Sequence, residues 1–103
     1  MSTVLPAQNG PSAELEQIIN KIKSLSNCGG ADGHLCHNDG TMIPVTVATC
    51  SPRGDIVRFG LRAPNHRSIG WSGSWRAIKH KFLNANTVLL MTPHEDYGLR
   101  LRI

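Results

Sequence analysis

The first apolar pattern in this chain has the spacing of an α-helix. Five aliphatic residues recur with a period of 3.6 and share one helix face: Leu15, Ile18, Ile19, Ile22 and Leu25. Ser12 precedes them at the position of a cap, and Gly29 and Gly30 follow at the position of a stop. The pattern predicts an amphipathic helix whose apolar face packs against the rest of the protein.

Apolar and polar residues then alternate in four segments, which predicts two β-hairpins. The first hairpin is expected over residues 43–61, with turn chemistry from proline and glycine at residues 51–55. The second is expected over residues 87–103, with its turn at residues 93–96. The alternation in the last strand reaches Ile103, so we expect the end of this sequence to be structural.

A second, shorter helix is predicted between the hairpins, over residues 74–83. Its apolar positions again have helical spacing: Trp75, Ile78, Phe82 and Leu83. The glycine-rich segments 27–41 and 63–73 are predicted to be loops. The resulting order, α-β-β-α-β-β, is typical of an α+β two-layer sandwich, in which an antiparallel four-stranded sheet carries two helices on one face.

Length and composition predict one small domain. Residues 1–11 combine proline and glycine with small polar residues and are expected to be a flexible arm, leaving residues 12–103 as the single α+β domain. No apolar stretch approaches the roughly 20 residues of a membrane helix, and no signal sequence is visible. Three cysteines do not make a disulfide framework, so we expect a reducing, cytoplasmic location and no membrane partner.

The formal charge of +4 is unevenly distributed. Residues 1–50 contain two lysines and four carboxylates, whereas residues 51–103 contain nine basic residues and three carboxylates. Two pairs of arginines, Arg58 with Arg62 and Arg100 with Arg102, alternate with the apolar residues of their strands and would lie on the open face of the sheet. Guanidinium groups placed in this way can bind phosphates through charge and forked hydrogen bonds.

We therefore expect a small non-enzymatic domain that binds nucleic acid or another polyanion through an arginine-rich sheet face. The candidate binding residues come from the strands and from the exposed side of the second helix: Arg58, Arg62, Arg76, Lys79, Lys81, Arg100 and Arg102. Only Trp71, in a predicted loop, is a candidate for base stacking, because the other aromatic residues have the phase of the core. This favours recognition of a duplex through its backbone.

Two interpretations without a polyanion stay open. Arginines on an outward sheet face also keep a sheet soluble and guard its edges. Alternatively, the domain is a protein-interaction module or a homodimer that pairs through a sheet edge, with the last strand as the expected edge.

A third alternative is a small metal-independent ribonuclease, which would make the protein an enzyme. His66 or His80 would be the general base, and His94 or Tyr97 the general acid. The developing negative charge would be stabilised by one of three cations: Arg67, Arg76 or Lys79.

We expect no cofactor, although one cluster has the residue types of a structural zinc site. Its members are Cys28, His34, Cys36 and His37. The spacing departs from common zinc patterns because no C-x2-C pair is present and Cys36 and His37 are adjacent, so they would point apart.

Overall fold

One helix and seven antiparallel strands form the described part of the chain, residues 13–64 and 66–103, in the computed structural model. Their bounds are α1 (Ala13–Asn27), β1 (Ala31–His37), β2 (Met42–Arg53), β3 (Ile56–Ala63), β4 (His66–Ser74), β5 (Lys79–Asn84), β6 (Thr87–Met91) and β7 (Tyr97–Arg102). The strands make a single sheet with the order β4-β3-β2-β1-β7-β6-β5.

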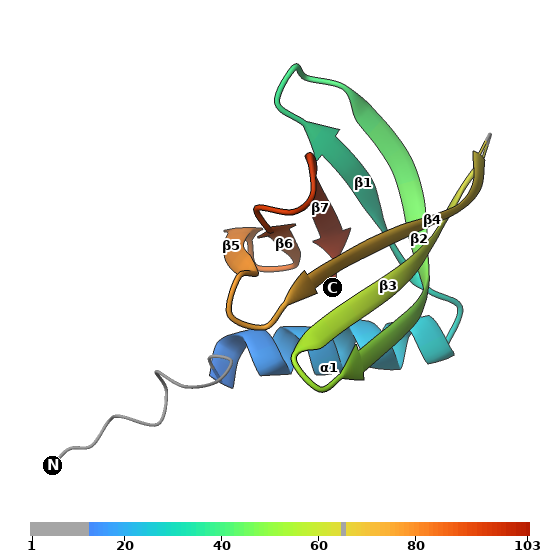
Figure 1. Ribbon diagram of the computed structural model, residues 1–103. Coiled ribbons are helices and arrows are strands. Elements are labelled where there is room, and N and C mark those ends of the chain that lie inside the picture. Colours follow the sequence, from blue (N-terminus) through green and yellow to red (C-terminus); the bar gives the residue numbers. More distant parts are fainter. Residues whose placement is uncertain (1–12, 65) are drawn as a thin grey trace, which may run out of the picture.

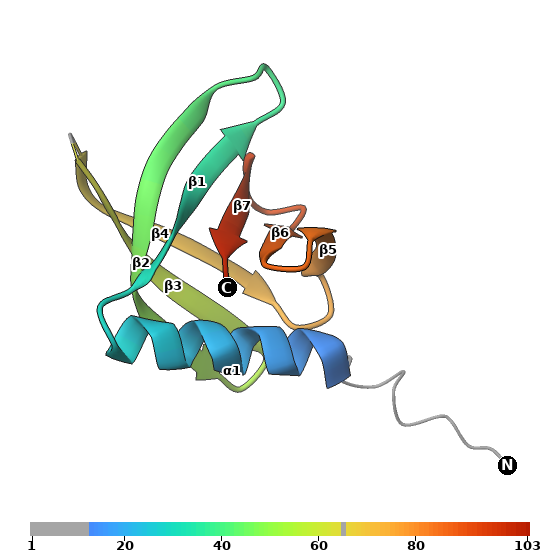
Figure 2. The same cartoon turned by 180° about the vertical axis from the view of Figure 1, so that it is seen from behind.

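The sheet curls into a half-barrel, and α1 lies across one end of it (Figure 1). The same arrangement is seen from behind in Figure 2, where α1 runs below β1 and β7 and crosses in front of the β2–β3 turn. The last strand, β7, does not lie at an edge, because it pairs with β1 on one side and β6 on the other. The two edges are β4 and β5.

The core fills the inside of the curl, as the alternation along the strands requires. In β3, for example, Val57, Phe59 and Leu61 are buried, whereas Arg58 and Arg62 between and after them are exposed. The apolar face of α1 completes the core through four buried residues: Leu15, Ile18, Ile19 and Ile22. A half-barrel leaves its end open to water, and this helix face covers the opening.

Two hydrogen bonds connect the edge strand β4 to the segment around the start of β7. The indole Nε1 of Trp71 donates to the carbonyl oxygen of Tyr97 at 2.9 Å, and the ring stacks on Phe59 in the core. The backbone N–H of Ser72 donates to the carboxylate of Glu95 at 3.1 Å. These bonds draw the two sides of the curl together and partner an N–H that an edge strand would otherwise leave free.

The predicted two-layer sandwich with four strands and two helices is wrong. Residues 74–83 do not form a helix, because the chain turns at residues 75–78 and then continues as β5. The helical spacing was misleading here. Trp75 and Ile78 pack into the core from the turn, whereas Phe82 and Leu83 are 40% and 45% exposed on the edge strand.

Two segments predicted to be loops form strands: residues 27–41 contain β1, and residues 63–73 contain all of β4 except its last residue, Ser74. Their glycines hid the strand pattern, since glycine contributes no side chain to the alternation. The predicted α1 and the strands of both hairpins are confirmed.

Some predictions fall outside the described residues, namely the flexible arm at residues 1–11 and the cap at Ser12. Within the described ranges, no helix is long and apolar enough to cross a membrane.

Cys50 gives a test of how tightly α1 covers the sheet. Its thiol is buried against the carbonyl oxygen of Ile19, and burial raises the pKa of Cys50 to about 11. In a variant that keeps only this cysteine, we expect almost no alkylation at pH 8, where about one thiol in a thousand is ionised, and rapid alkylation in denaturant. Mass spectrometry after timed labelling measures both rates. Labelling of the native protein as fast as a matched variant that keeps only the exposed Cys28 would contradict this packing.

Candidate functional site

Outward-facing residues of the sheet line up in rows that cross the strands. The first row runs from β3 to β5 and consists of Arg62, Thr46, Asp32, Arg102, Thr87 and Asn84. The second row, beside it, consists of Pro44, His34, Arg100, Leu89 and Lys81. These rows bring together residues from six strands that are far apart in the sequence.

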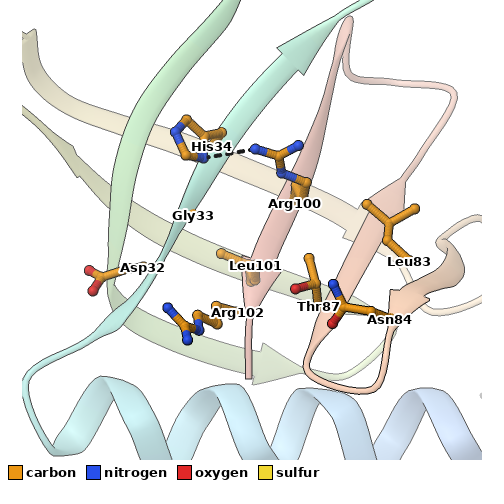
Figure 3. A pocket seen from close by; sticks show the side chains of 9 residues that line it. All are labelled: Asp32, Gly33, His34, Leu83, Asn84, Thr87, Arg100, Leu101 and Arg102. Atoms are coloured by element: carbon orange, nitrogen blue, oxygen red, sulfur yellow. Dashed lines mark hydrogen bonds between the residues drawn. The ribbon is translucent and has the colours of Figure 1, made fainter.

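Two hollows lie along these rows, one on each side of β1. The first has a volume of about 440 Å³ and lies between β1 and β5, with Arg100 and Arg102 in its lining (Figure 3). The second lies between β1 and β3 and includes Arg62 in its lining. Both hollows share Asp32, Gly33 and His34 of β1, so we treat them as one depression, called the transverse groove.

Gly33 lets β1 and β7 approach closely at the floor of this groove. A Cβ atom at this position would overlap the backbone carbonyl oxygen of Arg100 and would lie 2.9 Å from a methyl carbon of Leu101. Backbone cannot move aside as a flexible side chain can, so any larger residue must push the two strands apart. The spacing between Asp32, His34 and the arginines of β7 therefore depends on this glycine.

The groove contains donors for a negatively charged ligand. A guanidinium nitrogen of Arg100 lies 3.3 Å from Nδ1 of His34, and Figure 3 shows the two side chains meeting across the strands. Because guanidinium only donates, Nδ1 of His34 is the acceptor in this hydrogen bond. Asn84 and Thr87 add an amide and a hydroxyl to the lining. Such a set suits phosphate oxygens.

The cations of the outer sheet face are not neutralised by carboxylates. Five cations point outward from their strands: Arg62, Arg100, Arg102, Lys79 and Lys81. None of them forms an ion pair with a residue in the described ranges 13–64 and 66–103. Of the seven carboxylates, only Asp32 occupies an outward strand position. The other six lie in α1 or in turns: Glu14, Glu16, Asp39, Asp55, Glu95 and Asp96.

The remaining predicted binding residues lie outside the groove. Arg58 shares a separate hollow with Ser51, Arg53 and Ile56, near the β2–β3 turn. It lies four residues from Arg62, about 13 Å along β3. Lys79 is opposite Met91 in a third row, and Arg76 is exposed in the turn between β4 and β5. Lys81 lies in the second row but lines neither hollow. The structure thus gathers Arg62, Arg100 and Arg102 in the groove, with Lys81 in a row beside them, and separates the other three.

The aromatic candidate for base stacking changes. Trp71 is not in a loop but in β4, where its side chain is 1% exposed. Phe82, which the sequence placed in the core, is the exposed aromatic ring, with an edge contact to His80 at 6.5 Å between centroids. Its phase on β5 is the inward one, so it does not lie in the transverse groove.

The four candidate zinc ligands do not converge. Within residues 13–64 and 66–103, no three His, Cys, Asp or Glu side chains are placed to hold a metal ion. His34 and Cys36 point outward from β1, whereas His37 follows on the other side and packs on Tyr97 at 5.0 Å between ring centroids. Cys28 is exposed just after α1.

The candidate ribonuclease residues are also dispersed. His80 bonds through Nε2 to Glu14 of α1 at 2.6 Å. Tyr97 lies two strands and two residues away from it, about 12 Å by strand geometry. His94 is exposed in the β6–β7 turn, and the side chains of His66 and Arg67 lie outside the part that the structure describes.

The sequence did not identify four residues of the groove as candidates: Asp32, Thr46, Thr87 and Asn84. Asp32 fell in a predicted loop, and strand order is needed to see that these residues share a row. Comparison with protein-family models, curated proteins and solved structures finds no match to this chain.

The floor of the groove can be tested by Gly33→Ala. We expect a loss of about 1–3 kcal/mol in the free energy of unfolding, since the added methyl group overlaps backbone. Gly70→Ala is the matched control, because a Cβ there meets nothing within 4 Å and the change should stay within about 0.5 kcal/mol. Urea unfolding followed by tryptophan fluorescence measures both values. Equal stability of the two variants would show that β1 and β7 do not meet as closely as described.

Proposed function

We propose that this protein binds nucleic acid through the transverse groove, as a binding domain without catalytic activity. The observation that carries the proposal is the gathering of Arg62, Arg100 and Arg102 in adjacent rows of one sheet face, with no carboxylate paired to them. Guanidinium groups without a carboxylate partner, in a groove with amide and hydroxyl donors, match the oxygens of a phosphate backbone.

The position of the cations supports a ligand longer than a single phosphate. Arg62 and Arg102 are three strands apart in the same row, about 14 Å. One phosphate cannot bridge this separation, whereas a chain of phosphates can. Leu89 and Pro44 in the second row offer apolar contact to sugars and bases between the charges.

Sheet-edge pairing between two copies has less support. The outward positions of the β5 edge include Lys79 and Lys81, and lysines on an edge oppose pairing with another strand. At the other edge, β4, Glu95 already accepts a hydrogen bond from Ser72. The last strand, β7, was expected from the sequence to be an edge strand, but it lies between β1 and β6.

A ribonuclease also has less support than a binding domain. A general base and a general acid must both reach one scissile phosphate. His80 is occupied by Glu14 and lies about 12 Å from Tyr97.

Fluorescence anisotropy with labelled single- and double-stranded oligonucleotides tests the proposal. We expect binding that weakens as salt rises, because phosphate contacts release counterions. Substituting Arg62, Arg100 and Arg102 together by alanine should reduce affinity strongly at low salt. It should also make the slope of log K against log salt less steep by about 2, because each lost phosphate contact to a single strand accounts for about 0.7.

A matched triple variant separates a groove from general charge attraction. Arg53, Arg58 and Arg76 are exposed arginines outside the groove, and replacing them by alanine removes the same charge. We expect this variant to retain most of the affinity. Equal losses in both triple variants would mean diffuse attraction, and no binding by the unmodified protein at low salt would refute the proposal.

A further inference from the structure

A carboxylate lies between the two arginines of the first row. Asp32 lies between Thr46 and Arg102, and Thr46 is in turn opposite Arg62. Figure 3 shows Asp32 on the β1 side of the groove, with the side chain of Arg102 extending toward it from β7. Even so, Asp32 makes no ion pair with either arginine. The negative charge of Asp32 is therefore not neutralised by an ion pair with Arg62 or Arg102.

The hydrogen bonding of Asp32 leaves it able to bind further donors. One oxygen, Oδ1, accepts from the hydroxyl of Thr46 at 3.0 Å, which fixes the carboxylate in place. The side chain is exposed, and an ionised carboxylate has about four acceptor sites and no donor. A phosphate at this point would be repelled, so the centre of the row needs a ligand group that donates hydrogen bonds.

We propose that the groove binds a single strand and that Asp32 recognises a guanine base. The proposal rests on the nucleic-acid binding proposed above. Arg62 on one side and Arg102 on the other contact the phosphates that flank the base, and the carboxylate of Asp32 accepts hydrogen bonds from its Watson–Crick edge. The row then matches the order phosphate, base, phosphate along a strand.

The chemistry of the bases selects guanine. Its Watson–Crick edge presents N1–H and N2–H side by side, which suits the two oxygens of one carboxylate. Adenine and cytosine each offer an amino group next to a ring acceptor, and thymine offers one N–H between two carbonyl oxygens. A ring acceptor or a carbonyl oxygen beside the donor would face a negatively charged oxygen of Asp32.

The same chemistry requires a single strand. In a duplex, N1–H of guanine is already bonded to cytosine, and this edge is not accessible from either groove. A strand without a partner can turn a base toward the protein and place its backbone over the neighbouring cations. Recognition of a single strand departs from the duplex recognition that the scarcity of stacking aromatics favoured, because it rests on hydrogen bonds to a base edge.

Binding of short oligonucleotides tests this inference. The probe is an all-thymine DNA strand of about eight nucleotides, within the range that one small domain covers. A second strand carries one central guanine, a third carries hypoxanthine, which lacks the N2 amino group, and a fourth carries 7-deazaguanine, which keeps the Watson–Crick edge. We expect guanine and 7-deazaguanine to increase affinity about five- to tenfold over thymine, with hypoxanthine in between.

Variants of Asp32 must remove this preference. Asp32→Asn keeps the shape and an oxygen that accepts from Thr46, so the fold is retained, but its NH2 group only donates, so the side chain no longer offers two acceptor oxygens to N1–H and N2–H of guanine. We expect all four strands to bind Asp32→Asn with similar affinity, and the all-thymine strand to bind it at least as tightly as the unmodified protein. Asp55→Ala, in the β2–β3 turn, removes the same charge outside the groove and should keep the guanine preference.

The outcomes separate this inference from the proposed function. A guanine preference that survives Asp32→Asn, or no preference in the unmodified protein, would overturn the role of Asp32. If the duplex of the guanine-containing strand binds as tightly as the single strand or more tightly, the claim that the groove binds single strands would be overturned. The groove itself would still be supported if the all-thymine strand binds and the triple arginine variant loses that binding.

Discussion

β1 pairs with β7 along residues 33–37, and this contact joins the two halves of the sheet. One half contains β1 to β4 and the other contains β5 to β7. Without the pairing, the core would be divided, since Leu35 of β1 and Leu99 of β7 lie opposite each other inside the curl. The pairing also brings Arg100 and Arg102 beside Asp32 and His34, so the groove and the core depend on the same set of backbone hydrogen bonds.

The charge pattern of the outer face follows from this arrangement. The half from β1 to β4 contributes Arg62 and the single outward carboxylate, whereas the half from β5 to β7 contributes the arginines of β7 and the lysines of β5. Neither half alone has cations on both sides of Asp32. The outer sheet face is more positive than the overall charge of +4 suggests, because most carboxylates lie in α1 and in turns.

Sequence patterns predicted the elements whose side chains alternate or repeat clearly. Ile18, Ile19 and Ile22 identified α1, and the alternation in β3 and β7 placed their arginines on the outward face. The failures have physical causes. Gly33 and Gly70 weaken the alternation in β1 and β4, and Phe82 and Leu83 look like core residues although they are exposed on an edge.

The groove itself was not predictable from local patterns. Arg62 and Arg102 share a row only because β2 and β1 lie between their strands, and strand order depends on long-range pairing rather than on local spacing. The role of Asp32 was hidden for the same reason. In the sequence it is one acidic residue in a glycine-rich segment, and its position between two arginines appears only in the assembled sheet.

The β1–β7 contact also has a consequence for how the chain folds. Gly33 and Leu101 pair although 68 positions separate them, so the central contact of the sheet is among the most non-local ones. Closing such a loop costs entropy before its contacts form, which slows folding. During synthesis, β1 emerges long before β7 and must remain with an open edge until its partner arrives. An unpaired strand edge can join another chain, so this interval is when the protein is most exposed to aggregation.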